Sequence, residues 1–319
     1  MQFLKNLLAS VLGTFIAIVL SFVFLFILLA GIASSIDTAE EVYVKENSVL
    51  TISLQKPVTD RSPKQFEFEA AFDLDAEAIG LDKILASIRS AKDDDRIEGI
   101  SIEHTFLQSG MSQTLVIRDA LTDFKESGKF IYAYHDFFTQ KDYYLASVAD
   151  SVFVHPEGGV ELAGLASEVL YLKEFQDITG IEMQVIRSGA YKSAVEPFLQ
   201  DEMSDENREQ IKSLLDSFWS EMVVKIEERT ALTPTKINEI ASSLDALVSA
   251  NAVELGVVDN ALLRNEYTEL LRAKMELEED DKLHTIDIED YQQTVSTQLG
   301  EGKDRIAVVY AQGEIIYGE

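Results

Sequence analysis

The chain has 319 residues and a formal net charge of −29, from 27 lysines and arginines against 56 aspartates and glutamates. Its length corresponds to one large domain or two ordinary ones, and its 46% of hydrophobic residues excludes wholesale disorder. The acidity argues against nucleic-acid binding, because a protein that neutralises phosphates needs a basic face. The absence of cysteine excludes disulfides, thiolate catalysis and cysteine-based metal centres.

Neither a metal nor a cofactor is expected. No Gly-rich phosphate loop and no G-x-S-x-G motif occur in the sequence. The histidines are scattered without the spacing of metal ligands; they are His104, His135, His155 and His284.

The N-terminal region, residues 1–45, predicts a membrane anchor with a helix over about 8–33. No charged residue occurs between Asn6 and Ile36, and about 20 apolar residues suffice to cross a bilayer core. Lys5 precedes this stretch and acidic residues follow it, which predicts a cytoplasmic N-terminus and a body on the outer side. The alternative is a cleaved signal peptide, with a cleavage site within Ala30–Ser34.

Strands and helices alternate beyond the anchor, which is typical of stacked βαβ units around a mostly parallel sheet. The sequence therefore predicts an α/β fold. Strands are expected at Val49–Leu54, Ile97–Ile102, Phe130–Tyr134, Ser151–Val154, Glu168–Leu172 and Glu182–Ile186, and helices around Leu81–Ile88, Ile117–Phe124, Tyr143–Ala149 and Glu174–Thr179.

We place this domain at 46–285. Its last part, from about 204 to 275, is richer in helices. Ser204 is a suitable N-cap for a long helix, and Pro234 suits the first turn of another. Residues 286–319 are expected to be a linker and the first strand of a truncated second repeat, because Ile306–Ile315 resembles Val49–Val58. The alternative is a final strand of the same sheet.

One lysine is a candidate for chemistry. Lys192 follows a predicted strand and is surrounded in the sequence by Ala190, Ala194, Val195 and Phe198. An apolar setting favours the neutral amine, which can take a proton from a hydroxyl nucleophile. From composition alone, however, a lysine beside a turn is usually an exposed charge.

The segment Tyr191–Phe198, which follows a strand and a glycine, resembles the lysine motif of the signal peptide peptidase A (protease IV) family. The similarity extends over most of the chain, including the anchor, Tyr143–Ser147, Gly164 and Ala252–Asp259. The resemblance implies a crotonase/ClpP-like fold with a helical extension and a peptidase with a Ser–Lys dyad. It also implies a tandem repeat, whose first half supplies the general-base lysine and whose second half supplies the serine. Carried over by position, the catalytic lysine is Lys192.

The family's Ser-Pro-Gly-Gly turn is missing here. Its counterpart is Glu103–Gly110, and the counterpart of the family's Ala-Ser-Gly-Gly-Tyr-Tyr segment is Thr139–Tyr144, which keeps the tyrosines but not the glycines. The chain therefore resembles the degenerate repeat, and its nucleophile is expected beyond residue 319. Ser109 is the nearest remnant of the nucleophile turn and is assigned no site. Ser193 is interpreted as structural or as orienting the amine of Lys192, and Glu196 as a local pairing or capping residue.

The resemblance implies an enzyme that degrades cleaved signal peptides and other short hydrophobic peptides at the outer face of the bacterial cytoplasmic membrane. It implies a single membrane pass, a homo-oligomer, no cofactor and no nucleic-acid partner. One alternative is a non-catalytic crotonase-like scaffold that binds peptides or a membrane partner. A second, an acyl-CoA enzyme, is disfavoured because an anchored external body is unsuited to that cofactor.

Overall fold

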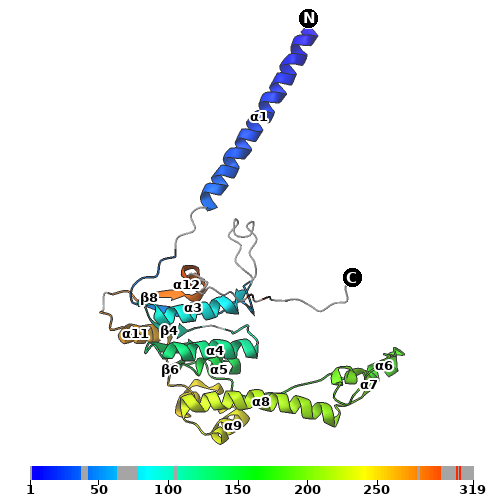
Figure 1. The fold of residues 1–319 in the computed structure, drawn as a ribbon, viewed down its shortest axis with the longest axis vertical. Coiled ribbons are helices and arrows are strands. Elements are labelled where there is room, and N and C mark those ends of the chain that lie inside the picture. The colour runs from blue at the N-terminus through cyan, green and yellow to red at the C-terminus, as the bar shows by residue number, and fades with distance from the viewer. Residues whose placement is uncertain are drawn as a thin grey trace.

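The computed structural model describes residues 2–36, 42–62, 78–103, 106–278, 281–295, 307 and 309. Helix α1 (Gln2–Ile36) contains the predicted anchor helix and stands apart from the body (Figure 1). Its stretch Lys5–Leu28 is long and apolar enough to cross a membrane, a property that a signal sequence near the N-terminus shares.

The body is built on a six-stranded sheet in which every strand pair is parallel, with the order β7-β6-β5-β4-β1-β8. The α/β fold class is confirmed. The strands are β1 (Ser48–Ile52), β4 (Ile97–Ile102), β5 (Phe130–His135), β6 (Ser151–Val154), β7 (Asn260–Ala261) and β8 (His284–Asp287), and a separate short pair joins β2 (Val58–Thr59) to β3 (Ile79–Gly80).

Alternating side chains give the sheet two covered faces, because successive residues of a strand point to opposite sides. Leu50 and Ile131 belong to the larger core, whereas Val49 and Phe130 pack with Tyr267 on the other face. The helices of the body are α3 (Leu81–Asp93), α4 (Met111–Lys125), α5 (Gln140–Ala146), α9 (Pro234–Ser243), α10 (Ser249–Glu254), α11 (Arg264–Lys274) and α12 (Ile288–Thr294), with the 3-10 turn η2 (Asp245–Leu247).

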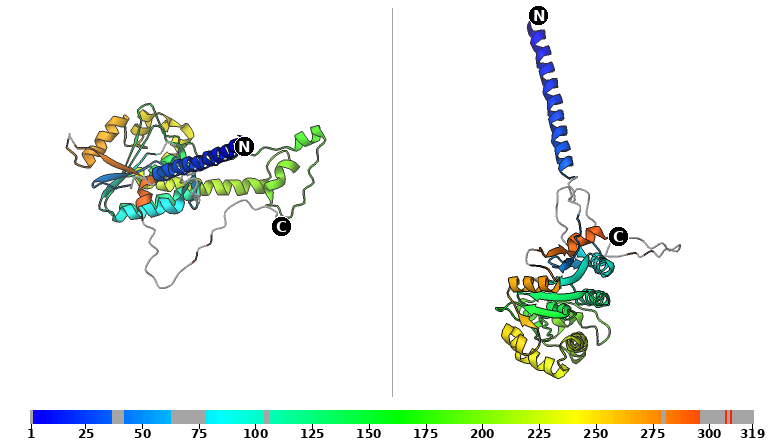
Figure 2. Two further views of the ribbon diagram at one scale, coloured as in Figure 1. Left: turned by 90° about the horizontal axis from the view of Figure 1, so that it is seen from above. Right: turned by 90° about the vertical axis from the view of Figure 1, so that its left-hand side faces the viewer.

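The long helix α8 (Asp205–Thr230) begins where the sequence predicts, since the Ser204 hydroxyl accepts a hydrogen bond from the Asn207 N–H. Near its C-terminal end it buries Met222, Val223 and Ile226. Its N-terminal part leads away from the body (Figures 1 and 2). The predicted helix at Pro234 is also present, with the Thr233 side chain as its N-cap.

Residues 165–204, which we call the arm, lie at the far end of α8 and contain α6 (Lys173–Thr179), the 3-10 turn η1 (Ser193–Val195) and α7 (Glu196–Leu199) (Figures 1 and 2). The strands predicted at 168–172 and 182–186 are wrong: both segments are irregular. A strand requires a neighbouring strand for its N–H and C=O groups, and no described strand pairs with either segment.

The sheet also extends past the domain limit expected from the sequence. Strand β8 pairs with β1, and α12 follows it at once and packs against α3, so residues 286–294 are structured rather than a linker. The strand expected at 306–315 lies outside the described residues, apart from 307 and 309.

Candidate functional site

The described residues 106–110, which we call the serine-like turn because they correspond to the end of the family's serine motif, are joined to the N-terminus of α5. The fully buried carboxylate of Asp142 accepts hydrogen bonds from the Leu107 N–H at 3.0 Å and from the Thr139 hydroxyl at 2.6 Å. The Leu107 N–H is therefore already bonded to the Asp142 carboxylate, and it is not available to a substrate oxyanion. The spacing of Thr139 and Asp142 is that of a capping box, a signal that could have been read from the sequence.

Ser109 has none of the contacts of a nucleophile. Its hydroxyl lies 2.6 Å from the hydroxyl of Thr114, and its carbonyl accepts a hydrogen bond from Nζ of Lys141 at 2.7 Å. Burial lowers the pKa of Lys141, but its amine is directed to the carbonyl of Ser109. These contacts agree with assigning Ser109 no site.

The two tyrosines that match the family's motif are buried supports of α5. The Tyr143 hydroxyl donates a hydrogen bond to the Val257 carbonyl at 2.5 Å, and burial raises the pKa of both Tyr143 and Tyr144 to about 12. Neither phenol ionises near neutral pH, so Tyr143 acts through packing and its hydrogen bond, and Tyr144 through packing.

Lys192 lies in the arm, between α6 and α7, with an exposed side chain. It follows Gly189, whose φ of +98° suits glycine, and it precedes the turn η1. Its neighbours Ala190 and Ala194 are also exposed, so the described residues do not supply the apolar setting expected from the sequence. The structure does not bring Lys192 and Ser109 together, since Ser109 precedes α4 in the body.

Glu196 anchors the segment that carries Lys192. Its carboxylate is fully buried and accepts hydrogen bonds from the Ser204 hydroxyl at 2.5 Å and the Asn207 side chain at 3.0 Å. Arg187 approaches the same carboxylate at 3.6 Å. The hydrogen bond from Ser204 is the main reason that the pKa of Glu196 lies below its usual range. The predicted pairing and capping role of Glu196 agrees with these contacts.

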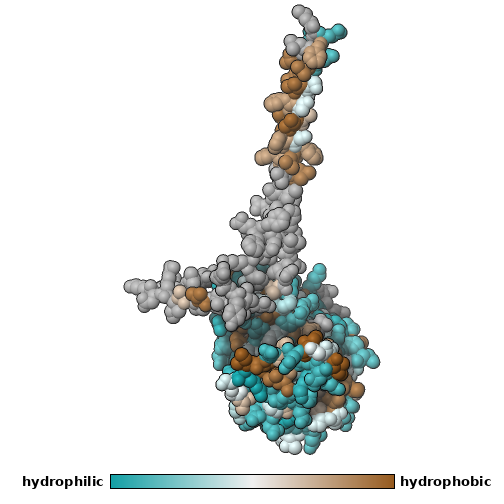
Figure 3. Space-filling view, turned by 90° about the vertical axis from the view of Figure 1, so that its right-hand side faces the viewer, coloured by the Kyte–Doolittle hydropathy of each residue, from teal (hydrophilic) through white to brown (hydrophobic). Residues whose placement is uncertain are grey.

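The arm exposes many large apolar side chains. Leu170 and Ile178 are 77% and 78% exposed. Figure 3, seen from the side on which α6 and α7 lie, shows hydrophobic patches on this face of an otherwise hydrophilic body. The other exposed large apolar residues of the arm are Leu165, Phe175, Ile181, Met183, Ile186 and Tyr191. An exposed apolar surface of this kind is typical of an interaction site.

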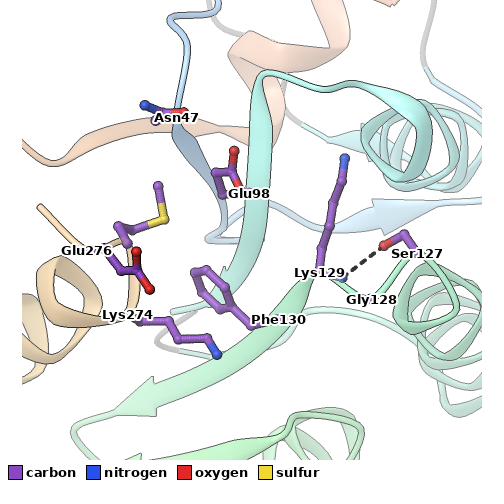
Figure 4. A pocket seen from close by; sticks show the side chains of 9 residues that line it. Asn47, Glu98, Ser127, Gly128, Lys129, Phe130, Lys274 and Glu276 are labelled. Atoms are coloured by element: carbon purple, nitrogen blue, oxygen red, sulfur yellow. Dashed lines mark hydrogen bonds between the residues drawn. The ribbon is translucent and has the colours of Figure 1, made fainter.

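A separate cavity of about 480 Å³ lies at the amino ends of the strands, opposite the edge that carries the serine-like turn (Figure 4). Glu98 and Phe130 mark the starts of β4 and β5 there. Lys129, which also lines it, donates hydrogen bonds to the carbonyls of Ala91 and Asp94. None of the predicted site residues lines this cavity.

Comparison with known proteins gives one family. The model of peptidase family S49 matches residues 123–278, which include α5, the arm with Lys192 and α8. This region therefore contains the proposed lysine but not the serine-like turn.

Three curated proteins are similar to the chain. Protease 4 of Haemophilus influenzae is 29% identical over 93% of the chain and 51% of its own length. Protease 4 of Salmonella typhi is 30% identical over 74% of the chain and 39% of its own length. The chloroplastic serine protease SPPA of Arabidopsis thaliana is 28% identical over 85% of the chain and 39% of its own length. The chain thus spans about half the length of these relatives or less.

Proposed function

Because the chain belongs to peptidase family S49, we propose that it is the base-donating half of a membrane-anchored serine peptidase of the signal peptide peptidase A type. The family has the ClpP- and crotonase-like architecture, to which the parallel sheet with its covering helices corresponds. The names of the three relatives support a peptidase, and the length they have in addition to the matched region leaves room for a second repeat.

The observation that carries the proposal is the exposed apolar surface of the arm around Lys192. Lys192 stands on a segment whose apolar side chains are exposed in the chain alone, while the buried Glu196 holds that segment in a defined shape. A second repeat that covers the arm would bury those side chains and favour the neutral amine of Lys192. The turn of the first repeat, closed by Asp142, is consistent with a nucleophile supplied from elsewhere.

In the proposed mechanism the Lys192 amine takes the proton of a serine hydroxyl of the second repeat. The serine oxygen attacks a peptide carbonyl, and backbone N–H groups stabilise the oxyanion. The Lys192 ammonium then returns its proton to the leaving amine, which yields an acyl-enzyme. Finally the neutral Lys192 activates a water molecule that hydrolyses the acyl group.

The proposed substrates are cleaved signal peptides and other short hydrophobic peptides. Helix α1 would hold the enzyme in the bacterial cytoplasmic membrane as a single pass, with the body on the outer side and near peptides released into the bilayer. We also propose a homo-oligomer, since further copies would cover apolar surface that one chain leaves exposed.

The test uses the full-length protein in detergent with a fluorogenic hydrophobic peptide. Lys192→Ala is expected to lower kcat by about two to four orders of magnitude, the range of a lost general base. Lys173→Ala, which removes an exposed lysine from the same arm, is the control and should cleave normally. Both variants are first checked for assembly by size-exclusion chromatography.

Normal cleavage by an assembled Lys192→Ala protein would remove this lysine from the mechanism. If the wild-type protein cleaves no peptide but still binds peptides, the scaffold function is favoured instead.

A further inference from the structure

A buried arginine lies at a basic cavity on the face of the body formed by α4, α5 and α8. Arg118 is only 4% exposed, because it lies on the same face of α4 as the buried residues Thr114 and Leu121. Burying a guanidinium is unfavourable unless an opposite charge compensates it. Among the described residues, no carboxylate forms an ion pair with Arg118.

The contacts of Arg118 leave most of its donors unused. Its Nε donates a long hydrogen bond of 3.4 Å to the Ser147 hydroxyl, and its guanidinium lies 5.6 Å from the centre of the Tyr144 ring. The Ser147 hydroxyl in turn donates to the Tyr144 carbonyl at 2.7 Å. A guanidinium has five N–H donors, so the terminal nitrogens of Arg118 have no protein partner in the described part of the chain.

The cavity beside Arg118 has a volume of about 500 Å³. Its lining includes four cations against three carboxylates, an unusual balance in a chain with a net charge of −29. The cations are Arg118, Lys125, Lys225 and Arg229, and the carboxylates are Asp119, Asp150 and Glu228.

The other cations already have partners. Lys125 pairs with Asp150 at 2.8 Å and Lys225 with Glu228 at 3.0 Å, while Arg229 pairs with Asp259. The buried Nε of Arg229 has no hydrogen-bond acceptor among the described residues. The cavity thus combines a buried guanidinium that has no ion pair among the described residues with a second unused arginine N–H.

We propose that this cavity binds a phosphate-class oxyanion, with the Arg118 guanidinium as its main ligand. A tetrahedral dianion can accept hydrogen bonds from several directions at once, and the planar fork of arginine suits two of its oxygens. The site is independent of the proposed peptidase centre, because it lies at the end of α5 opposite to Thr139 and includes no residue of the arm.

The test measures thermal unfolding of the full chain in detergent during titration with sodium phosphate, with sodium chloride added to hold the ionic strength constant. The wild-type protein should show a saturable rise in Tm, since a ligand that binds only the folded state stabilises it. Arg118→Met should remove the rise, and Arg118→Lys should weaken the apparent affinity for phosphate about tenfold. Lys236→Met, which removes an exposed cation from α9, should respond like the wild type.

A second readout does not depend on a variant that folds. The ³¹P resonance of inorganic phosphate should broaden on addition of the wild-type protein, and acetate at the same ionic strength should not reverse this. An unchanged Tm and resonance would overturn the proposal, as would a response in Arg118→Met equal to the wild type. Stabilisation by acetate but not by phosphate would overturn the assignment to phosphate.

Discussion

Glu196 shows how one residue gives the arm its shape. It is four positions after Lys192, at the start of α7, and it binds Ser204 and Asn207 at the start of α8. The carboxylate therefore ties the segment that carries Lys192 to the end of a long helix. We regard Glu196 as a positioning residue for the lysine, not as a catalytic one.

Glu196→Ala is expected to lower cleavage by the assembled enzyme about 10- to 100-fold, because the segment around Lys192 loses its buried anchor. Amide hydrogen exchange over residues 187–204 should become faster in the same variant. Glu196→Gln keeps an acceptor oxygen and should recover part of the activity. Glu182→Ala, which removes an exposed carboxylate of the arm, should affect neither measurement. Unchanged exchange in Glu196→Ala would argue against the anchoring role.

Asp142 is an anchoring residue of the body, as Glu196 is of the arm. It joins α5 to the serine-like turn. Asp142→Ala should destabilise the protein by about 1–3 kcal/mol, because the Leu107 N–H loses its acceptor. Asp142→Asn retains an acceptor and should cost less. Urea unfolding measures both, and Asp136→Ala, an exposed carboxylate nearby, should stay within about 0.5 kcal/mol of wild type. Equal stability of the two alanine variants would contradict this role for Asp142.

At the scale of elements, the turn between α3 and β4 holds α12 in place. The Asp94 carboxylate accepts hydrogen bonds from the Arg96 side chain and from the Tyr291 hydroxyl at 2.9 Å. The hydrogen bonds from Arg96 are the main cause that lowers the pKa of Asp94 to about 2. The ionised Asp94 thus adds a polar contact to the packing of α12 against α3.

This predicts a defined loss of stability in acid. Because the pKa of Asp94 is lower in the folded than in the unfolded chain, its contribution is complete above about pH 4 and is lost as the pH falls through 2. The contribution is about 2 kcal/mol at most. Urea unfolding between pH 5 and pH 2 should show a smaller decrease in Asp94→Asn than in the wild type. Parallel pH curves for the two proteins would contradict the assignment.

The elements of the body could be predicted from the sequence because their patterns are local. Strand β4 occupies the predicted residues, and Ser204 caps α8 as expected. The failures concern partners distant in the sequence. The apolar segments around 170 and 184 have strand-like composition, but no described strand lies beside them, whereas β8 forms where it can pair with β1.

The candidate site was predictable only in part for the same reason. The motif around Lys192 can be recognised in the sequence, but its exposure depends on what else covers the arm. The acceptor role of Asp142 toward Leu107 spans 35 positions, and no local pattern indicates it. The buried setting of Arg118 likewise depends on α5 and α8, which follow it in the chain.

At the scale of the whole molecule, the arm and the body should differ in local stability. The body has a continuous core, whereas the segment 181–192 is mostly exposed and irregular. Trypsin should therefore cleave the 319-residue chain first after Arg187 and Lys192. In the full-length protein the same sites should be protected by the proposed second repeat. Mass spectrometry of timed digests would show this, and equal cleavage of the two proteins would contradict a covered arm.

The neighbouring positions of β1 and β8 also have a mechanical consequence. The chain enters the sheet at Ser48, after α1, and leaves it through Asp287 and α12, and these two strands run side by side in parallel. A pull between α1 and a segment beyond α12 would load the β1–β8 hydrogen bonds in shear, all at once rather than one by one. The segment that joins the sheet to α1 and the segment that continues beyond α12 thus start from the same pair of strands. A force applied between them would load this pair and leave most of the sheet unloaded.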